Sequence, residues 1–148
     1  MDAHHAATLL PDTPDTAHSR KLRLPLAAGK ATAGFPSPAT DHVERRLDLN
    51  DHLVLHPQAT FFMRVKGDSM IGAGIHDGDL LIVDRSLEPV SGRVVVAAVD
   101  GELTVKRLQR RRNRIILQAE NPAYSGITVG EDQELQIWGV VAYVVHAP

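Results

Sequence analysis

The chain has 148 residues, of which sixteen are basic, eighteen acidic and 43% hydrophobic, giving a formal charge of −2. This length and apolar content predict one packed domain and are too small for two ordinary ones. The near balance of charge and the 4% aromatic content argue against a general nucleic-acid binder or a base-stacking platform, and the absence of cysteine excludes disulfides, Cys-ligated zinc and a thiol nucleophile.

The first 40 residues differ in composition from the rest. They are rich in Ala, Thr and His, and proline, which removes a backbone donor and breaks helices, occurs repeatedly. These prolines are Pro11, Pro14, Pro25, Pro36 and Pro38. We therefore predict a flexible N-terminal arm over residues 1–40 and a β-rich domain over residues 41–148.

No segment is apolar enough to suggest a membrane anchor. The longest apolar runs, such as Val94 to Val99, are far shorter than the roughly 18 residues needed to span a bilayer. The short apolar stretch from Ala6 to Leu10 ends at Pro11 and makes a poor signal peptide. We expect a soluble protein of the cytoplasm that does not bind membranes.

From Asp41 onward, six short segments rich in β-branched residues predict strands. Turn signals separate them, and Asp100-Gly101 between two such segments is a strong hairpin signal. The predicted strands are Phe61–Lys66, Leu80–Asp84, Arg93–Val99, Glu102–Leu108, Arg114–Ala119 and Gln136–His146. The spacing predicts a mostly β fold, a compact, curled and largely antiparallel β domain. Helix is expected only as short turns within Asp41–Leu53 and Ser69–Ile75.

The eight histidines form no recognised metal-binding motif. There is no HExxH and no acidic cluster at ligand spacing, and the one pair four residues apart is followed directly by Pro57. No histidine stands out as a partner for a serine nucleophile. We interpret them as ordinary surface and terminal residues and expect no metal and no cofactor. They are His4, His5, His18, His42, His52, His56, His76 and His146.

Ser69 is the first candidate for chemistry. It follows a predicted strand and the turn Gly67-Asp68, and such a turn can expose a hydroxyl while backbone N–H groups point at the same place, as acyl transfer requires. On this pattern alone, a serine after Gly-Asp is as a rule only a turn residue.

Lys106 is the second candidate. It lies mid-strand, on one face with Thr104 and Leu108 if side chains alternate. It could be an exposed strand lysine. Alternatively, apolar surroundings could lower its pKa and leave a neutral amine able to deprotonate a serine. Periodicity does not decide between the two.

Seven stretches after residue 33 carry a family resemblance. They are Gly34–Ala39, Asp48–Asn50, Gly67–Ile71, Gly78–Asp84, Ala97–Lys106, Asn121–Ser125 and Trp138–Val141. In their order and residues they resemble the UmuD family of SOS mutagenesis proteins, relatives of the LexA-type repressors in one self-cleaving peptidase group. The resemblance extends from Gly34 to the end of the chain.

The resemblance implies a serine endopeptidase that cuts itself. Ser69 corresponds to the nucleophile, Lys106 to the general base, and Ala33-Gly34 to the cleaved bond. The family cuts after a small residue, which Ala33 matches. The backbone N–H groups of Ser69 and Asp68 are expected to form the oxyanion hole. An extended chain is long enough for Gly34 to reach Ser69 in the same subunit, and cleavage within or between subunits both stay open.

The resemblance also implies partners. The shortened product would be a homodimeric accessory subunit of an error-prone Y-family translesion polymerase of the UmuC type. RecA filaments would promote its cleavage after DNA damage. No sequence-specific DNA binding is expected, because the basic cluster Arg110–Arg114 lies where a hairpin turn is predicted and reads as a solvated turn.

Three other functions compete with this one. A LexA-like cleavable regulator would need a helix-turn-helix domain before the cut, and the proline-broken residues 1–33 do not fit one. A signal peptidase also uses serine and lysine but would need a membrane anchor. In a third, non-catalytic reading, the chain is a β-rich protein-interaction module whose serine and lysine are structural. Self-cleavage into residues 1–33 and 34–148 would exclude this last reading.

Overall fold

The computed structural model describes residues 20–36, 38–39 and 42–148. The chain divides into two units, and the boundary between the smaller one and the main body lies between Leu55 and His56. The predicted boundary after residue 40 falls inside the smaller unit, so the extent of an independent peptidase domain stays a prediction. None of the helices in the described ranges is long and apolar enough to cross a membrane.

The smaller unit contains a two-stranded antiparallel sheet that the sequence did not predict. Strand β1 (Leu24–Ala27) pairs with β2 (Val43–Leu47), and helix α2 (Leu49–Leu53) follows. Pro25 is tolerated because both strands are edges and its missing N–H has no obligatory partner. Of the predicted flexible arm, residues 1–19 lie outside the described residues, whereas part of the remainder is a paired strand.

Asp48 links the segment before β1 to the start of α2. Its buried carboxylate caps α2 by accepting the N–H of Asn50 at 2.8 Å, and it also accepts the N–H of Leu22, just before β1, at 2.9 Å. Burial alone would raise the pKa of Asp48, but these backbone hydrogen bonds outweigh it and lower the pKa. Asp48 is thus a structural N-cap that ties the arm to the helix.

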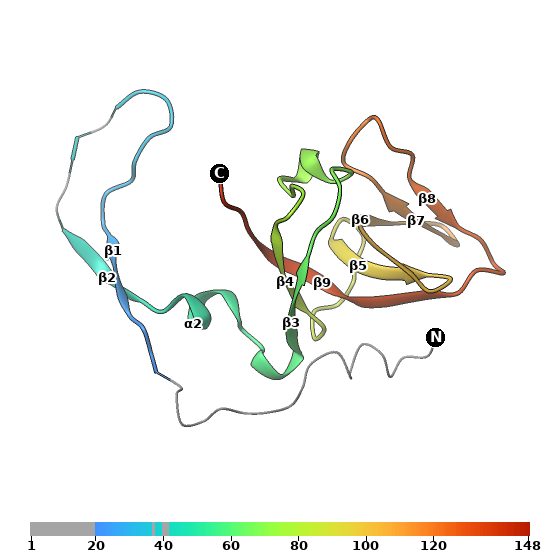
Figure 1. Cartoon of the computed structure of the whole chain (residues 1–148), viewed down its shortest axis with the longest axis horizontal. Helices are drawn as coiled ribbons and strands as arrows, with labels where there is room; N and C mark the ends of the chain where they lie inside the picture. The colour runs from blue at the N-terminus through green and yellow to red at the C-terminus, as the bar shows by residue number, and fades with distance from the viewer. Residues whose placement is uncertain (1–19, 37, 40–41) are drawn as a thin grey trace. The chain divides into compact units, whose positions relative to one another are not determined.

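The main body is built on a seven-stranded antiparallel sheet with the order β3-β4-β9-β5-β6-β7-β8 (Figure 1). Its strands are β3 (Thr60–Arg64), β4 (Leu80–Asp84), β5 (Val94–Val99), β6 (Glu102–Arg111), β7 (Arg114–Gln118), β8 (Ile127–Val129) and β9 (Leu135–Val145). Two short 3-10 helices, η2 (Pro57–Ala59) and η3 (Ile71–Ala73), complete it. The mostly β, antiparallel prediction is confirmed, and the six predicted strands correspond to six of the seven.

Strand β5 lies between two hydrophobic clusters, and this position accounts for its uninterrupted run of apolar residues. Its side chains alternate, with Val96 and Ala98 in one cluster and Val95, Ala97 and Val99 in the other. A strand buried on both faces reads as a continuous apolar run rather than an alternating one. The first cluster also contains Phe61, Met70, Ile75, Leu81, Val83 and Trp138. This cluster anchors the segment around Ser69.

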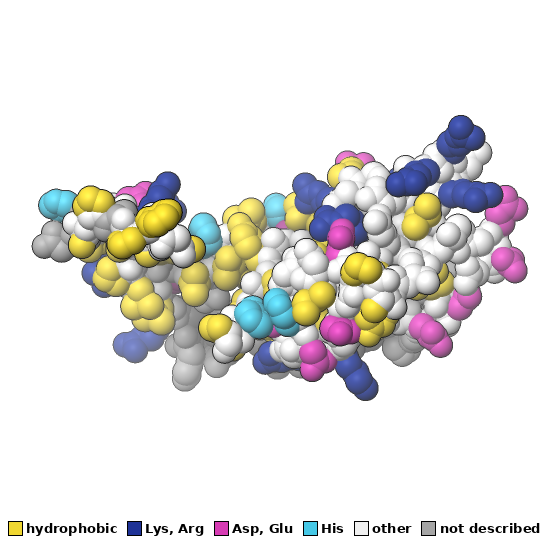
Figure 2. All heavy atoms as spheres, turned by 90° about the horizontal axis from the view of Figure 1, so that it is seen from above, with side chains coloured by type: hydrophobic (Ala, Val, Ile, Leu, Met, Phe, Trp, Pro, Cys, Tyr) yellow, Lys and Arg dark blue, Asp and Glu magenta, His cyan; other side chains and the backbone are white. Residues whose placement is uncertain are grey.

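The basic cluster lies at the tip of the β6–β7 hairpin. Arg111 pairs with Arg114 across the turn, and Arg112 takes a left-handed φ of 56°. All four arginines of the cluster are exposed, and Figure 2 shows Lys and Arg side chains projecting into solvent. This agrees with the predicted solvated turn.

A fragment that starts at Gly34 should fold without the arm. It loses β1 and leaves β2 without its partner, but it keeps every strand of the seven-stranded sheet and both hydrophobic clusters. We therefore expect a cooperative thermal unfolding transition, followed by circular dichroism, within a few degrees of that of the full chain. A broad, non-cooperative transition would mean that residues before Gly34 belong to the core.

Candidate functional site

Ser69 lies on the loop between β3 and β4, held between a glycine turn and a core anchor. Gly67 takes a φ of +94°, which L residues rarely adopt, and its N–H donates to the Asp77 carboxylate at 2.7 Å. Met70, the residue after the serine, is 2% exposed and packs into the first hydrophobic cluster. These two constraints leave Ser69 half-buried, between the solvent-exposed turn and the core.

The loop between β3 and β4, residues 65–79, is called the serine loop below. A second loop, just after β7, is hydrogen-bonded to it. The N–H of Glu120 donates to the carbonyl of Ser69 at 2.9 Å, and the N–H of Gly72 donates to the carbonyl of Glu120 at 2.7 Å. The Asn121 side-chain amide donates to the carbonyl of Asp68 at 2.9 Å. From the sequence, the Asn121–Ser125 stretch is only part of the family resemblance, and nothing in it predicts this role at the site.

Tyr124 extends this second attachment. Its hydroxyl donates to the Asp68 carboxylate at 2.5 Å, next to Ser69. This hydrogen bond and the negative charge of Asp68 raise the pKa of the Tyr124 phenol, because both favour its protonated form. The phenol therefore stays a donor well into the alkaline range.

Lys106 reaches Ser69 from β6. Its Nζ lies 3.0 Å from the Ser69 Oγ, 2.9 Å from the Thr104 Oγ1 and 3.2 Å from the Val105 carbonyl oxygen. The two-residue spacing of Thr104 and Lys106 puts them on one face of the strand, as predicted. The structure therefore brings together the two residues that the sequence singled out, 37 positions apart.

The Lys106 amine is in an environment that disfavours its charged form. The residue is only 8% exposed, and its three hydrogen-bond partners among the described residues are uncharged oxygens. Burial removes water from the ammonium group and lowers the pKa of Lys106 below its ordinary value. Of the two sequence readings, the exposed strand lysine is therefore wrong.

A pocket of about 370 Å³ opens beside the two side chains. Its wall combines apolar side chains, from Met63, Val65, Met70, Leu103 and Val105, with the polar or charged side chains of Arg64, Lys66 and Thr104, and Ser69 and Lys106 are among the lining residues. A short segment of chain with both apolar and polar groups could lie there against the serine hydroxyl.

The predicted oxyanion-hole donors are on the same loop. Within the described residues, the backbone N–H groups of Asp68 and Ser69 donate to no protein acceptor. Donors without an internal acceptor are available to a developing oxyanion. Their role in catalysis stays a prediction.

Ala33 and Gly34 belong to the smaller unit, in a bend between β1 and β2. Both are exposed, and no atom comes within 4 Å of a Cβ built on Gly34. The Thr32 hydroxyl donates to the Phe35 carbonyl across them. The predicted cleavage site is thus an accessible stretch of chain outside the strands.

Gly72→Ala should lower the free energy of unfolding by about 1–3 kcal/mol. A Cβ at this position would lie 2.6 Å from the Glu120 carbonyl oxygen, so the backbone that holds the serine loop would have to move. Gly34→Ala, which meets nothing within 4 Å, is the matched control and should change stability by less than about 0.5 kcal/mol. Urea unfolding measures both. Equal stability of the two variants would mean that the contact between the loops is not tight.

Comparison with known proteins gives consistent matches. The model of the family described as Peptidase S24-like matches residues 25–142. Protein SamA of Salmonella typhimurium is 49% identical over 122 residues, 82% of this chain and 84% of that protein. Protein MucA of Escherichia coli is 44% identical over 126 residues, 84% of this chain and 86% of that protein. The LexA repressor of Shewanella piezotolerans is 42% identical over 127 residues, 85% of this chain and 61% of that protein.

Proposed function

Because this chain belongs to the Peptidase S24-like family, as a UmuD-type member of its LexA/UmuD group, we propose that it cuts its own Ala33-Gly34 bond with Ser69 and Lys106. The observation that carries the proposal is the 3.0 Å separation of the Lys106 Nζ and the Ser69 Oγ, with the amine buried. At this distance a neutral amine can accept the hydroxyl proton directly.

In the proposed reaction, the Lys106 amine takes the proton from Ser69 while Oγ attacks the carbonyl carbon of Ala33. The resulting oxyanion is stabilised by the N–H groups of Asp68 and Ser69. When the carbon–nitrogen bond breaks, the Lys106 ammonium gives the proton to the amine of Gly34, which leaves. Water then attacks the carbonyl carbon of the acyl-serine while the lysine takes its proton. The bond between this carbon and the Ser69 Oγ breaks, the lysine returns the proton to Oγ, and the carboxyl group of Ala33 is released.

Thr104 and the burial of Lys106 support this cycle in different ways. The Thr104 hydroxyl, 2.9 Å from the Lys106 Nζ, accepts a hydrogen bond from the amine and so helps to orient it, without adding a charge to the site. The burial of the lysine keeps water from most of its side chain, which keeps the neutral form accessible. The cleavable segment need bind only weakly, because its covalent tether supplies a high effective concentration.

The biological role that we propose is that of the SOS mutagenesis proteins. After cleavage, residues 34–148 would act as a homodimeric accessory subunit of a Y-family translesion polymerase of the UmuC type, and RecA filaments would promote the cut. The support is the resemblance to the UmuD family, together with the similarity to SamA and MucA over more than four fifths of this chain.

The experiment is incubation of the purified chain with and without RecA filaments, followed by mass spectrometry of the products. The proposal predicts two fragments that end at Ala33 and begin at Gly34, formed faster with the filament. A chain that stays intact under both conditions, at neutral and alkaline pH, would favour the non-catalytic interaction module.

Ala33→Trp should slow cleavage by at least about 100-fold. The family cuts after a small residue, and an indole in place of the methyl group would keep the carbonyl carbon from reaching the Ser69 Oγ. Ala31→Trp, at an exposed position two residues before, adds the same bulk away from the bond and is the matched control. Cleavage rates from gel densitometry compare the two. Equal rates for Ala33→Trp and the parental chain would show that the cut is elsewhere.

A further inference from the structure

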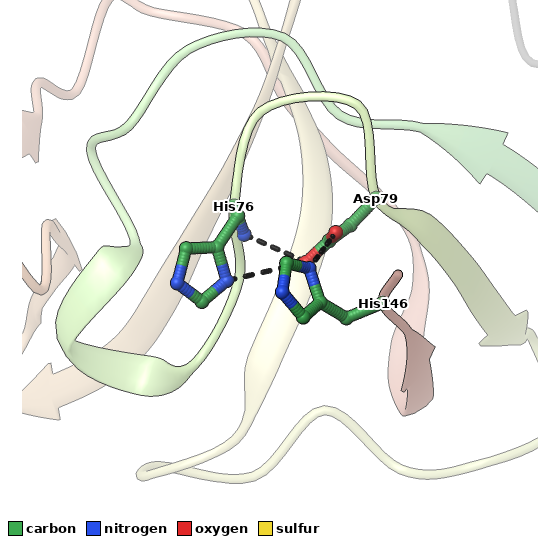
Figure 3. Close-up of side chains that lie close together, drawn as sticks. All are labelled: His76, Asp79 and His146. Carbon is green, nitrogen blue, oxygen red and sulfur yellow. Dashed lines mark hydrogen bonds and ion pairs between the residues drawn. The ribbon is translucent and has the colours of Figure 1, made fainter. Parts of the chain in front are cut away.

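A second group of reactive side chains lies on the other side of the turn that leads into β4. His76, Asp79 and His146 come from two distant parts of the chain, and one imidazole nitrogen of each histidine and one carboxylate oxygen of Asp79 all lie within 4.8 Å of one another. Figure 3 shows the two imidazole rings side by side with the Asp79 carboxylate against them. The proposed peptidase reaction uses none of the three.

The sheet register explains why these residues meet. Leu80 at the start of β4 pairs with Val145 at the end of β9, so the residues just outside the pair, Asp79 and His146, are also opposite each other. The turn before β4 brings His76 back over the carboxylate, because its N–H donates to the Asp79 Oδ2 at 2.7 Å. No sequence motif marks the group, because Asp79 and His146, which are hydrogen-bonded to each other, are 67 positions apart in the sequence.

Within the group, the Nδ1 atom of His76 makes no hydrogen bond. The His146 Nδ1 lies 2.6 Å from the Asp79 Oδ1, and the two imidazole rings stack with centroids 4.3 Å apart. The His76 Nδ1 faces the Asp79 Oδ2 at 3.6 Å, beyond hydrogen-bond distance, and it is buried with no hydrogen-bond partner among the residues that the structure describes. A buried polar nitrogen without a partner costs free energy, so a ligand that satisfied it would stabilise the fold.

The chemistry of the donors selects the ligand. Two imidazole nitrogens and one carboxylate oxygen suit zinc and neighbouring transition metals, whereas Mg²⁺ and Ca²⁺ prefer oxygen ligands throughout. The Asp79 side chain is only 3% exposed, and it is fixed in place by the N–H of His76, which donates to its Oδ2 at 2.7 Å. The site therefore holds its carboxylate ligand in one position.

We propose that His76, Asp79 and His146 bind a divalent transition-metal ion of the zinc type, with water as the fourth ligand. In a tetrahedral site the ligand atoms lie about 3.3 Å apart, given metal–ligand distances of about 2.0–2.1 Å. The His146 and His76 Nδ1 atoms lie 2.6 Å and 3.6 Å from the Asp79 carboxylate oxygens, on either side of this spacing, and each histidine side chain is 41% exposed.

The ion would fasten the end of β9 to the turn that supports the serine loop. In that turn, the Asp77 carboxylate accepts the N–H of Gly67, and the N–H of Gly78 donates to the Val65 carbonyl at 2.8 Å. Metal binding would thus stabilise the backbone just before Ser69 and raise the thermal stability of the main body, without any ligand from the proposed catalytic pair.

The test is thermal unfolding of the full chain with ZnCl₂ or MgCl₂. Zn²⁺ at about 100 times its dissociation constant should raise the Tm by about 5–10 °C, and Mg²⁺ should leave it unchanged. His76→Ala and His146→Ala should each abolish the rise. His52→Ala, which removes a histidine from the smaller unit, is the matched control and should keep it.

A rise of the same size in both cluster variants, or none in the parental chain, would overturn the proposal and identify any Zn²⁺ binding as adventitious. Should either variant fail to fold, imidazole ¹⁵N chemical shifts of the parental chain provide a second measurement. Addition of Zn²⁺ should move the Nδ1 signals of His76 and His146. If those signals stay in place while other histidines respond, the site does not exist.

Discussion

Ser69→Ala and Lys106→Ala should each leave the chain full length under conditions in which the parental chain cuts itself. The serine supplies the nucleophile that attacks the Ala33 carbonyl carbon, and the lysine is within reach to deprotonate it, 3.0 Å away. Residues that act as one unit lose activity together, so each single variant should lower the cleavage rate by at least about 10⁴-fold. The rates come from the amounts of the two fragments over time, measured by mass spectrometry.

Two further variants separate chemistry from structure in this experiment. Lys106→Met keeps the apolar stem that packs in the buried site but removes the amine, so it should fold and stay uncut. Lys66→Ala removes an exposed lysine that also lines the pocket and should cut close to the parental rate. Cleavage of Lys106→Met at the parental rate would eliminate the lysine as the base.

The unassisted cleavage rate should rise with pH through the alkaline range and then level off. Only the neutral amine can accept the serine proton, and its fraction grows about tenfold per pH unit below the pKa of the lysine. Burial lowers the pKa of Lys106, so the plateau should begin below the ordinary lysine value of about 10.4. A partner that withdraws the amine further from water would shift the rise to lower pH.

A series of cleavage rates from about pH 6 to 11 checks this prediction, with folding verified by circular dichroism at each pH. Ser69→Ala serves as the control for contaminating proteases, since its background should be subtracted at every pH. A flat profile, or a rate that falls between neutral pH and pH 9, would rule out a neutral lysine base and would point to a histidine instead.

The main strands could be predicted because their local sequence patterns follow from their burial and from the turns that connect them. The apolar run of β5 reflects burial on both faces, and Asp100-Gly101 marks the β5–β6 hairpin, where both residues take left-handed φ values. The placement of Lys106 and Thr104 on one face of β6 followed from strand alternation, and the structure adds the 2.9 Å hydrogen bond between them. In each case a local pattern corresponds to a local physical requirement.

The parts that the sequence did not predict depend on long-range contacts. Strand β1 contains a proline and forms only because β2 pairs with it. The burial of Lys106, which periodicity left open, depends on the walls of a pocket contributed by residues on both sides of Ser69. Likewise, the attachment of the serine loop to Glu120 and the meeting of His76 with His146 arise from strand order and register, which no local pattern encodes.

The intact masses of the products test the central claim most directly. Purified parental chain and Ser69→Ala are incubated side by side at alkaline pH, without any partner, and every new species is weighed. We predict two products from the parental chain, Met1–Ala33 and Gly34–Pro148, and none from Ser69→Ala. A break at another bond, or the same break in both proteins, would contradict self-cleavage by Ser69 at Ala33-Gly34.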